Sequence, residues 1–249
     1  MKRYRFSPYA MIAPTVTDAN LFVQHGSELP PGARLLPPCS PSKIVCVGRN
    51  YPEHARELGN EPPKEPLIFL KPPSSLIASG DSIVYPALSE RVDFEGELGV
   101  IIGKRARHVK TADAASYVLG YTCVNDVTAR DLQKKDGQWT RGKGFDTFCA
   151  VGPSMTPRED VDEATLTVRT YVDGEKKQEA PVSEMMFSVD AIISYVSEFM
   201  TLEPGDLIAT GTPPGVGSGM KPPKFLNVGD VVTLGIEGLG EQRQEIVAA

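Results

Sequence analysis

Two glutamates stand two residues apart in the stretch DFEGELGV, at Glu95 and Glu97. Side chains two residues apart in a strand leave the same face of a sheet, so we expect these carboxylates to lie side by side. Buried neighbouring carboxylates repel each other and destabilise the fold unless a positive partner joins them. A hard divalent cation such as Mg²⁺, Mn²⁺ or Ca²⁺ is one such partner, because these ions prefer oxygen ligands whereas zinc prefers His and Cys.

A third carboxylate for such an ion is Asp126, at the end of the apolar segment SYVLGYTCVND. Three carboxylates that each supply one oxygen would leave about half of an octahedral shell open for water and substrate. The alternative is that Glu95 and Glu97 line a solvated strand edge and that Asp126 caps a turn. The Glu-x-Glu motif alone favours that alternative, because short motifs match by chance at a high rate.

His54 and Glu57, in PEHARE, are three residues apart on a predicted helix and therefore share one of its faces. A carboxylate beside an imidazole orients the ring, as a general base near neutral pH requires. A chance pair on a surface helix fits the same spacing. Lys143 lies between two glycines in RGKGFDTF, which suits a side chain that reaches an anionic ligand, although a solvated turn lysine is equally compatible.

The loop ATGTPPGVGSG, residues 209–219, is dense in Gly, Pro and Thr. No Gly-Lys-Ser/Thr follows, so it is not a Walker loop, and it lacks the glycine spacing of a dinucleotide site. A loop that contacts a ligand and a plain tight turn both remain compatible with it.

Short strands are the main elements that must position these residues. Four strands are expected at KIVCVG, LIFLKP, SIVYP and ELGVIIG, of which KIVCVG and ELGVIIG are expected to be buried. A short helix is expected between Pro52 and Gly59. SYVLGYTCVND is a helix or a strand, ATLTVRTYVDGEKKQEA is a hairpin around Asp-Gly, and SVDAIISYVSEFM is an amphipathic helix capped by Ser188 or Asp190. Because strands and helices do not alternate, the chain is predicted to be α+β and β-rich rather than a doubly wound parallel sheet.

Composition narrows the class of protein. The hydrophobic content of 41% and charged content of 23% are ordinary for a globular protein, and the net charge of −6 argues against a nucleic-acid partner. Apolar runs are only strand-sized and the N-terminus lacks the apolar core of a secretory signal, so no membrane partner is expected. The four scattered cysteines are expected to be reduced core thiols, and the protein to be cytoplasmic. A small N-terminal segment, residues 1–40, is expected before a larger domain, residues 41–249.

Six segments in order resemble the fumarylacetoacetate hydrolase family, and particularly its short members, which include acylpyruvases, oxaloacetate decarboxylases and 2-hydroxyhepta-2,4-diene-1,7-dioate isomerases. They are KIVCVGRNYPEHARELGN, PLIFLKPPSSL, VDFEGELGVIIGKRAR, GYTCVNDVTARDLQ, WTRGKGFDTFCAVGP and ATGTPPGVG. The resemblance covers roughly residues 43–247. It implies a mixed, distorted β-sandwich roll with few short helices, a homodimer, and a Mg²⁺ or Mn²⁺ ion at the mouths of the strands.

The resemblance also implies roles for individual residues. The metal ligands would be Glu95, Glu97 and Asp126. The catalytic residues would be Lys143 and the dyad of His54 and Glu57 on a mobile lid helix. Arg130, Gln133 and Thr212 would contact the substrate. The aspartate that adds a metal ligand in longer members has no counterpart here.

The implied activity is metal-dependent hydrolysis of a C–C bond in a small diketo acid of the acylpyruvate or fumarylpyruvate type, in the catabolism of aromatic compounds. His54 would activate water, and the reaction would pass through a metal-bound enolate. Oxaloacetate decarboxylation and isomerisation or tautomerisation of a 2-oxo diacid use the same enolate and stay open. A metal-dependent binding protein without catalysis, or a Schiff-base enzyme that uses Lys143, is a further alternative.

Overall fold

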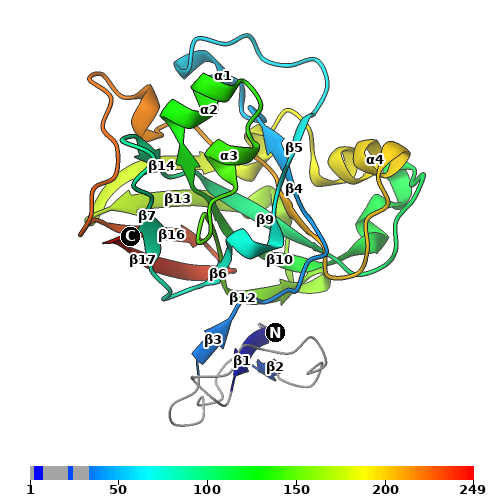
Figure 1. The fold of residues 1–249 in the computed structure, drawn as a ribbon. Helices are drawn as coiled ribbons and strands as arrows, with labels where there is room; N and C mark the ends of the chain where they lie inside the picture. The colour runs from blue at the N-terminus through cyan, green and yellow to red at the C-terminus, as the bar shows by residue number, and fades with distance from the viewer. Residues whose placement is uncertain (1–2, 8–21, 25–33) are drawn as a thin grey trace.

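The computed structural model describes residues 3–7, 22–24 and 34–249, and the side-chain environments of residues 35–249. Two β-sheets make up most of this part of the chain (Figure 1). The larger sheet runs in the order β2-β1-β12-β10-β9-β15-β4-β5, with β3 paired to β1 and β6 paired to β12. The smaller sheet runs β14-β13-β16-β17-β7, and β8 pairs with β11. Parallel and antiparallel pairs are mixed, which confirms a strand-rich α+β fold without doubly wound topology.

The strands of the larger sheet are β1 (Arg3–Ser7), β2 (Phe22–Gln24), β3 (Arg34–Leu36), β4 (Ile44–Gly48), β5 (Leu67–Lys71), β6 (Leu76–Ala78), β9 (Gly96–Ile102), β10 (Val118–Asp126), β12 (Cys149–Pro157) and β15 (Leu207–Ala209). The smaller sheet contains β7 (Ile83–Tyr85), β13 (Thr167–Val172), β14 (Glu175–Pro181), β16 (Val231–Ile236) and β17 (Gly240–Ala248). The two-stranded pair consists of β8 (Val92–Asp93) and β11 (Thr128–Ala129).

The helices are short. They are α1 (Pro52–Glu57), α2 (Arg130–Asp136), α3 (Thr140–Lys143) and α4 (Val189–Phe199). Short 3₁₀ segments lie at Pro73–Ser75, Thr111–Tyr117, Arg158–Asp160, Glu163–Thr165, Val182–Glu184 and Gly217–Gly219.

Local sequence explains most of these elements. The Ser188 hydroxyl accepts a hydrogen bond from the Ala191 N–H, so Ser188 rather than Asp190 caps α4. Asp173 and Gly174 both have positive φ, as the two-residue turn of the predicted hairpin requires. SYVLGYTCVND forms strand β10, which pairs with β9 on one side and β12 on the other. Nearly every residue of β10 is buried, and a strand buried on both faces lacks the alternating pattern that identifies a strand.

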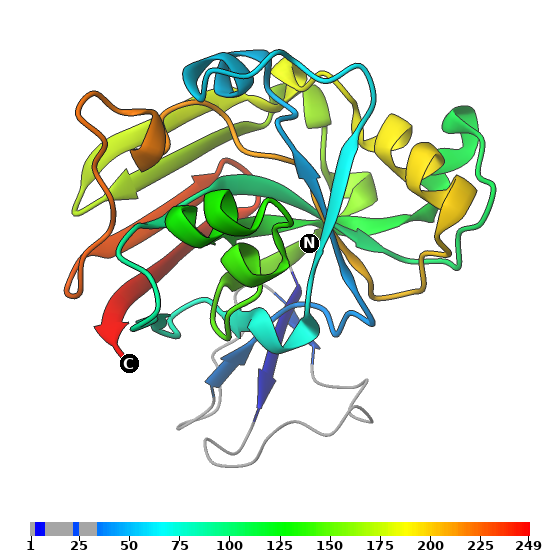
Figure 2. The same cartoon turned by 45° about the horizontal axis from the view of Figure 1, so that its top comes forward.

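The core lies between the sheets and under α4. One buried cluster joins Val196 of α4 to Val100 of β9 and Val168 of β13. Figure 2 shows the long curved strands of both sheets, with α4 beside them. Strand β9 is buried along its whole length, so polar side chains at its start stand on a rigid support.

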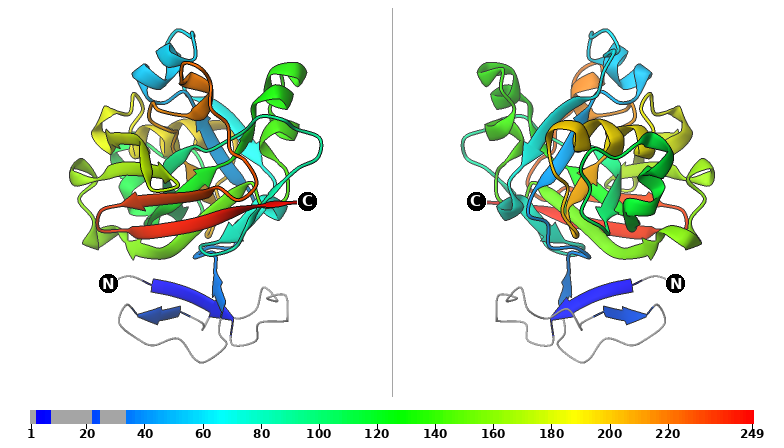
Figure 3. Two further views of the ribbon diagram at one scale, coloured as in Figure 1. Left: turned by 90° about the vertical axis from the view of Figure 1, so that its left-hand side faces the viewer. Right: turned by 90° about the vertical axis from the view of Figure 1, so that its right-hand side faces the viewer.

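The three N-terminal strands lie at one end of the molecule, and α1 and α2 lie at the other (Figures 1 and 3). Strand β1 pairs with β12 at Arg3 and Met155. Much of the 1–40 segment falls outside the described residues, so its treatment as a separate unit stays a prediction. All four cysteines are buried and none forms a disulfide. Within the described ranges, no helix is long and apolar enough to cross a membrane.

Candidate active site

A cavity of about 410 Å³ opens where β4 and β9 meet α1, α2 and α3. Its lining comes from segments far apart in the sequence. The lining residues are Val47, Gly48, Arg49, His54, Leu58, Asn60, Phe69, Glu95, Glu97, Arg130, Gln133, Lys134, Trp139, Lys143, Thr212 and Ser218.

Three buried carboxylates converge at the base of this cavity. Ligand oxygens of Glu95, Glu97 and Asp126 all lie within 4.8 Å of one another. They meet because the start of β9 runs antiparallel to the end of β10, where the Asp126 N–H donates to the Glu95 carbonyl at 2.9 Å. The alternative of a solvated strand edge is therefore wrong, since all three residues are buried.

The glycine between the two glutamates is required by the second sheet. A Cβ at Gly96 would lie 2.1 Å from the Thr170 Oγ1 on β13. The Gly96 N–H donates to the Gln178 Oε1 at 3.0 Å, and the Gly96 carbonyl accepts from the Thr212 Oγ1 at 3.0 Å. The Gln178 Nε2 in turn donates to Thr212 at 2.7 Å, so β14 fixes both β9 and the 209–219 loop.

Protein cations surround the carboxylates. The Lys143 Nζ lies 2.6 Å from the Glu95 Oε2 and 2.7 Å from the Asp126 Oδ2. The Lys71 Nζ, at the end of β5, lies 2.6 Å from the Asp126 Oδ1. The Arg130 Nη2 lies 2.7 Å from the Glu95 Oε1. Lys143 ends α3 and is buried, which excludes the solvated turn lysine.

These cations are unevenly distributed among the three carboxylates, so the pKa values of Glu95 and Glu97 shift in opposite directions. Burial alone would raise the pKa of Glu95, but the Lys143 ammonium and the Arg130 guanidinium hold it well below its usual range. Burial, reinforced by Asp126 and Glu95, raises the pKa of Glu97 well above its usual value. The donors are all carboxylate oxygens, and one of them lacks a charged partner of its own. This set fits a hard divalent cation such as Mg²⁺ or Mn²⁺.

The predicted dyad stands at the cavity on α1. The His54 Nδ1 lies 2.8 Å from the Glu57 Oε1, which confirms that the two side chains share a face. With Nδ1 engaged, Nε2 is the nitrogen that remains for a ligand. The Glu57 Oε2 accepts a hydrogen bond from the Gly215 N–H at 3.0 Å, so the same carboxylate ties α1 to the 209–219 loop. Pro52 begins this helix and the positive φ of Gly59 follows its end.

Asp93 holds Arg130 and a second part of the 209–219 loop in place. This fully buried carboxylate accepts from the Arg130 Nε at 2.8 Å, the Gly217 N–H at 2.8 Å and the Ser218 N–H at 3.0 Å. It thereby couples the 209–219 loop to Arg130. The Arg130 Nη1 also donates to the Gln133 Oε1 at 3.2 Å, so these two predicted substrate contacts form one unit.

The structure brings all nine predicted residues to this region. Seven of them line the cavity directly, Asp126 lies among the buried carboxylates, and Glu57 holds His54. Sequence reasoning missed the residues that support them. These are Lys71, Asp93 and Gln178, together with Arg49 and Trp139 in the cavity wall. The only signals were a lysine that closes the apolar run LIFLK and an aspartate two residues before Glu95.

Comparison with known proteins identifies the family and the fold of this chain. The family model described as fumarylacetoacetate (FAA) hydrolase C-terminal matches residues 43–247. The chain belongs to the fumarylacetoacetate hydrolase family. Its strand-rich α+β arrangement is the fold of that family, as a TM-score of 0.82 to fumarylacetoacetate hydrolase from Exiguobacterium antarcticum shows. That structure is 43% identical, with 87% of this chain and 79% of the other covered.

Two other family members have informative names. The chain is 45% identical over 208 residues to the mitochondrial oxaloacetate tautomerase Fahd2a of Rattus norvegicus, covering 83% of this chain and 66% of the relative. It is also 45% identical to a crystal structure of 2-hydroxyhepta-2,4-diene-1,7-dioate isomerase from Mycobacterium marinum, with a TM-score of 0.79. That alignment covers 91% of this chain and 83% of the other.

Proposed function

We propose that this family member is a metal-dependent enzyme that tautomerises or isomerises a small 2-oxo diacid, with the keto and enol forms of oxaloacetate as the model reaction. One observation carries the proposal: the His54–Glu57 dyad and the buried carboxylates serve the same cavity. Binding alone needs positive charge but no oriented base, so the dyad argues for catalysis. The names of the tautomerase and isomerase relatives favour this chemistry over the hydrolysis expected first from the sequence.

The proposed metal ligands are Glu95, Glu97 and Asp126, which would hold Mg²⁺ or Mn²⁺. A bound cation of this kind acts as a Lewis acid and stabilises negative charge on the oxygen of the 2-oxo group. Lys71 keeps the Asp126 side chain in place from the far side of the carboxylate.

Arg130, Gln133 and Thr212 are proposed to bind the substrate. The Asp93 carboxylate orients the Arg130 guanidinium before any ligand arrives, which lowers the entropic cost of binding an anion. Lys143 adds a fixed positive charge, and because its side chain is buried this charge has a larger effect on a developing anion than a solvated charge has.

His54 is proposed to move the proton. In tautomerisation of the keto form, its Nε2 would remove a proton from C3 and later release it to solvent, while the oxygen at C2 would take a proton from solvent water. The reverse direction returns the proton to C3. Glu57 holds the ring in position through Nδ1. No water needs to be activated, so this role differs from the hydrolytic one only in which proton His54 takes.

Oxaloacetate supplies the test, because its enol absorbs ultraviolet light. The purified protein should accelerate enol-to-keto conversion with Mg²⁺, and chelation by EDTA should remove that acceleration. Acetylpyruvate cleavage and oxaloacetate decarboxylation should be measured alongside. No acceleration of tautomerisation, whether or not Mg²⁺ is present, would refute the proposal.

Hydrolysis of a diketo acid is the second candidate, favoured by the 43% identity to a fumarylacetoacetate hydrolase. Cleavage of acetylpyruvate faster than oxaloacetate tautomerisation would put this candidate first. The homodimer and the division into residues 1–40 and 41–249 also stay proposals. The match that begins at residue 43 supports the division, and light scattering on the purified protein measures the oligomer.

A further inference from the structure

Arg49 is a cavity residue that the proposed reaction does not use. It directly follows β4, lines the cavity and has a φ of 57°, in the left-handed region that non-glycine residues rarely adopt. The other described non-glycine residues with positive φ are His108, Thr147 and Asp173, and none of them lines this cavity. An unfavourable backbone conformation at a binding cavity is a reason to look for a function.

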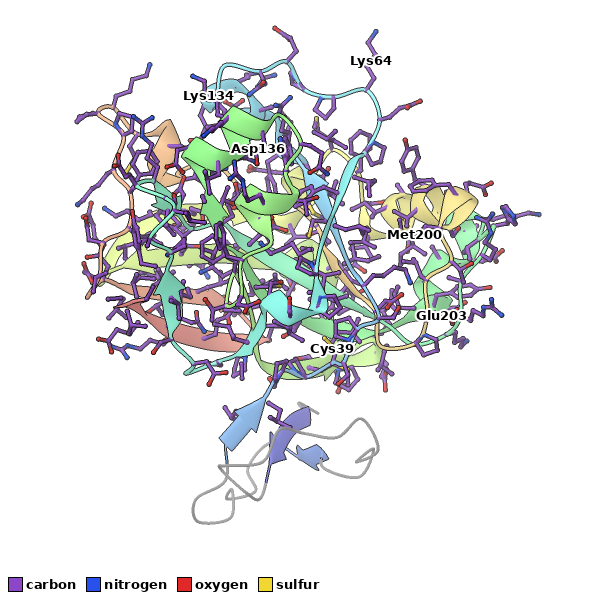
Figure 4. All side chains as sticks on the ribbon, viewed as in Figure 1. Cys39, Lys64, Lys134, Asp136, Met200 and Glu203 are labelled. Atoms are coloured by element: carbon purple, nitrogen blue, oxygen red, sulfur yellow. The ribbon has the colours of Figure 1, made fainter. Side chains whose placement is uncertain are left out.

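Among the described residues, no carboxylate pairs with the Arg49 guanidinium. Arg49 is half-buried, whereas the cavity cations Arg130 and Lys143 lie deeper and are paired with Glu95, Asp93 or Asp126. Within residues 35–249, the Arg49 side chain makes no ion pair or hydrogen bond. Its guanidinium carbon lies over the Trp139 ring, 5.8 Å from the ring centroid. Lys134 also lines the cavity, but Figure 4 shows it on the outer surface near α2, where water solvates its ammonium.

Trp139 is a fixed platform for this guanidinium. Its ring packs edge-on against Phe69 with centroids 5.1 Å apart. A Cβ at Gly48 would lie 2.8 Å from the Trp139 Cζ3, so the absence of a side chain there admits the ring. An arginine that rests on an aromatic ring keeps its planar N–H groups available at the edge, where they match the two oxygens of a carboxylate.

We propose that Arg49, supported by Trp139, binds the distal carboxylate of the substrate and so selects 2-oxo diacids over 2-oxo monoacids. This inference rests on the proposed function and deepens it. The first carboxylate and the 2-oxo group would bind the cation that Glu95, Glu97 and Asp126 are proposed to hold, beside Arg130. Arg49 enters the cavity from β4, whereas Arg130 enters from α2, so one small diacid can engage both guanidiniums within about 410 Å³.

Three probes in the presence of Mg²⁺ separate the two ends of the site. Oxaloacetate carries both carboxylates, 2-oxobutanoate has the same chain length with a methyl group at the distal end, and oxalate occupies only the proximal end. Their affinities should be measured by calorimetry on the wild type and on Arg49→Met, Arg49→Lys and Arg49→Gly. The glycine variant removes the guanidinium but also relieves the backbone, so agreement between Arg49→Met and Arg49→Gly assigns the effect to the side chain.

The expected result is a selective loss. Oxaloacetate affinity should fall about 10- to 100-fold in Arg49→Met and Arg49→Gly, as the loss of a charge-assisted hydrogen-bond pair predicts. The affinities for 2-oxobutanoate and oxalate should stay within about twofold. The oxaloacetate affinity of Arg49→Lys should lie between those of the wild type and Arg49→Met, because lysine keeps the positive charge but lacks the paired N–H donors of the guanidinium. Lys135→Met, which removes one exposed positive charge from α2 outside the cavity lining, is the control for net charge.

Equal losses for all three probes would show that Arg49 only shapes the cavity, and they would overturn the inference. A wild type that binds oxaloacetate no better than 2-oxobutanoate would overturn it too. These binding measurements do not need turnover. A diacid preference that disappears in Arg49→Met therefore supports the inference even if the protein proves unable to tautomerise oxaloacetate.

Discussion

At the scale of single residues, the two glutamates of DFEGELGV have opposite properties despite facing one cavity. The cations of the site lie on Glu95 and Asp126, whereas among the described residues the Glu97 side chain accepts a hydrogen bond only from the backbone N–H of Gly211, at 2.8 Å. The pKa of Glu97 is therefore raised while that of Glu95 is lowered. A proton and a divalent cation compete for Glu97.

Magnesium binding should release a proton from Glu97. Because the raised pKa keeps Glu97 protonated above its ordinary range, metal affinity should rise with pH until that raised pKa is passed. Calorimetry of Mg²⁺ binding in buffers of different ionisation enthalpy measures the proton release. Glu97→Gln should bind Mg²⁺ at least about tenfold more weakly and release no proton. Glu245→Gln, an exposed site on β17, should behave as wild type, and unchanged proton release in Glu97→Gln would disprove the assignment.

Replacement of His54, the proposed base, should lower turnover while leaving ligand binding nearly unchanged. His54→Gln should lower the turnover of oxaloacetate by about 10²- to 10⁴-fold, the usual range for a lost general base. Oxalate binding should change little, because oxalate presents no proton to remove. The exposed His108, which pairs with Glu198, provides a matched control, and His108→Gln should keep full activity. Comparable losses of turnover and oxalate binding in His54→Gln would contradict the role of a base.

At the scale of elements, strand β9 serves two structures at once. Glu97 of β9 and Glu95, which directly precedes the strand, line the cavity, and Gly96 faces β13 of the second sheet. The spacing of the carboxylates thus depends on the distance between the sheets. Gln178 and Thr212 lock that relation by hydrogen bonds to the Gly96 N–H and carbonyl.

A methyl group at Gly96 should disturb both the fold and the proposed metal site. Gly96→Ala would place Cβ against the Thr170 Oγ1 and 2.8 Å from the Leu234 Cδ1, so we expect a loss of about 1–3 kcal/mol in the free energy of unfolding and weaker Mg²⁺ binding. Urea titration and calorimetry measure these effects. The strand glycine Gly235 is the matched control, because its nearest neighbour would be 3.7 Å away and Gly235→Ala should be close to neutral. Equal stability of Gly96→Ala and Gly235→Ala would show that β9 can shift far enough from β13 to accommodate the added methyl group.

Much of this arrangement could be predicted from the sequence, and there are physical reasons why the rest could not. Predictions worked where the information is local: the Asp-Gly turn, the Ser188 cap, and the His54–Glu57 spacing on one helix. β10 stayed ambiguous because burial on both faces removes the period of two. Lys71 was missed because a lysine that ends a strand normally reaches water, and only the fold turns it toward Asp126.

Arg49 and Asp93 were missed for a related reason. Their roles depend on partners contributed by other parts of the chain, Trp139 for the first and the Gly217 N–H for the second. No spacing rule connects such positions. Residue types and spacing supplied six of the nine predicted positions, and the resemblance to a family added Arg130, Gln133 and Thr212. The contacts that orient these residues could be found only in three dimensions.

At the scale of the whole molecule, a single carboxylate fastens the outer part of the larger sheet. Asp206 precedes β15, and its Oδ1 accepts from the Ser42 N–H at 2.9 Å, the Ser42 Oγ at 2.7 Å and the Lys43 N–H at 3.2 Å, just before β4 begins. It also pairs with the Lys43 ammonium. Because β4 and β15 are parallel neighbours, these bonds hold the segment that leads to Arg49 and α1 against the centre of the sheet.

Loss of the Asp206 charge should destabilise the protein in a pH-dependent way. Burial alone would raise the pKa of Asp206, but hydrogen bonds from Glu203, Lys43 and Ser42 lower it. A lowered folded-state pKa gives stability that is complete above the ordinary Asp pKa and is lost as the pH falls through the folded value. Asp206→Asn should cost about 2–3 kcal/mol near neutral pH in urea titrations, and the difference should shrink in acid. The exposed Asp113→Asn should show neither effect, and a pH-independent loss in Asp206→Asn would rule out the charge as the cause.

The bond between the Glu57 Oε2 and the Gly215 N–H has a practical consequence for protein engineering. It joins α1 to the 209–219 loop, whereas the three buried carboxylates stand at β9 and β10 of the larger sheet. Libraries that randomise residues 60–66 and 221–223, and that leave residues 213–219 unchanged, should therefore alter substrate preference while the proposed metal ligands keep their positions.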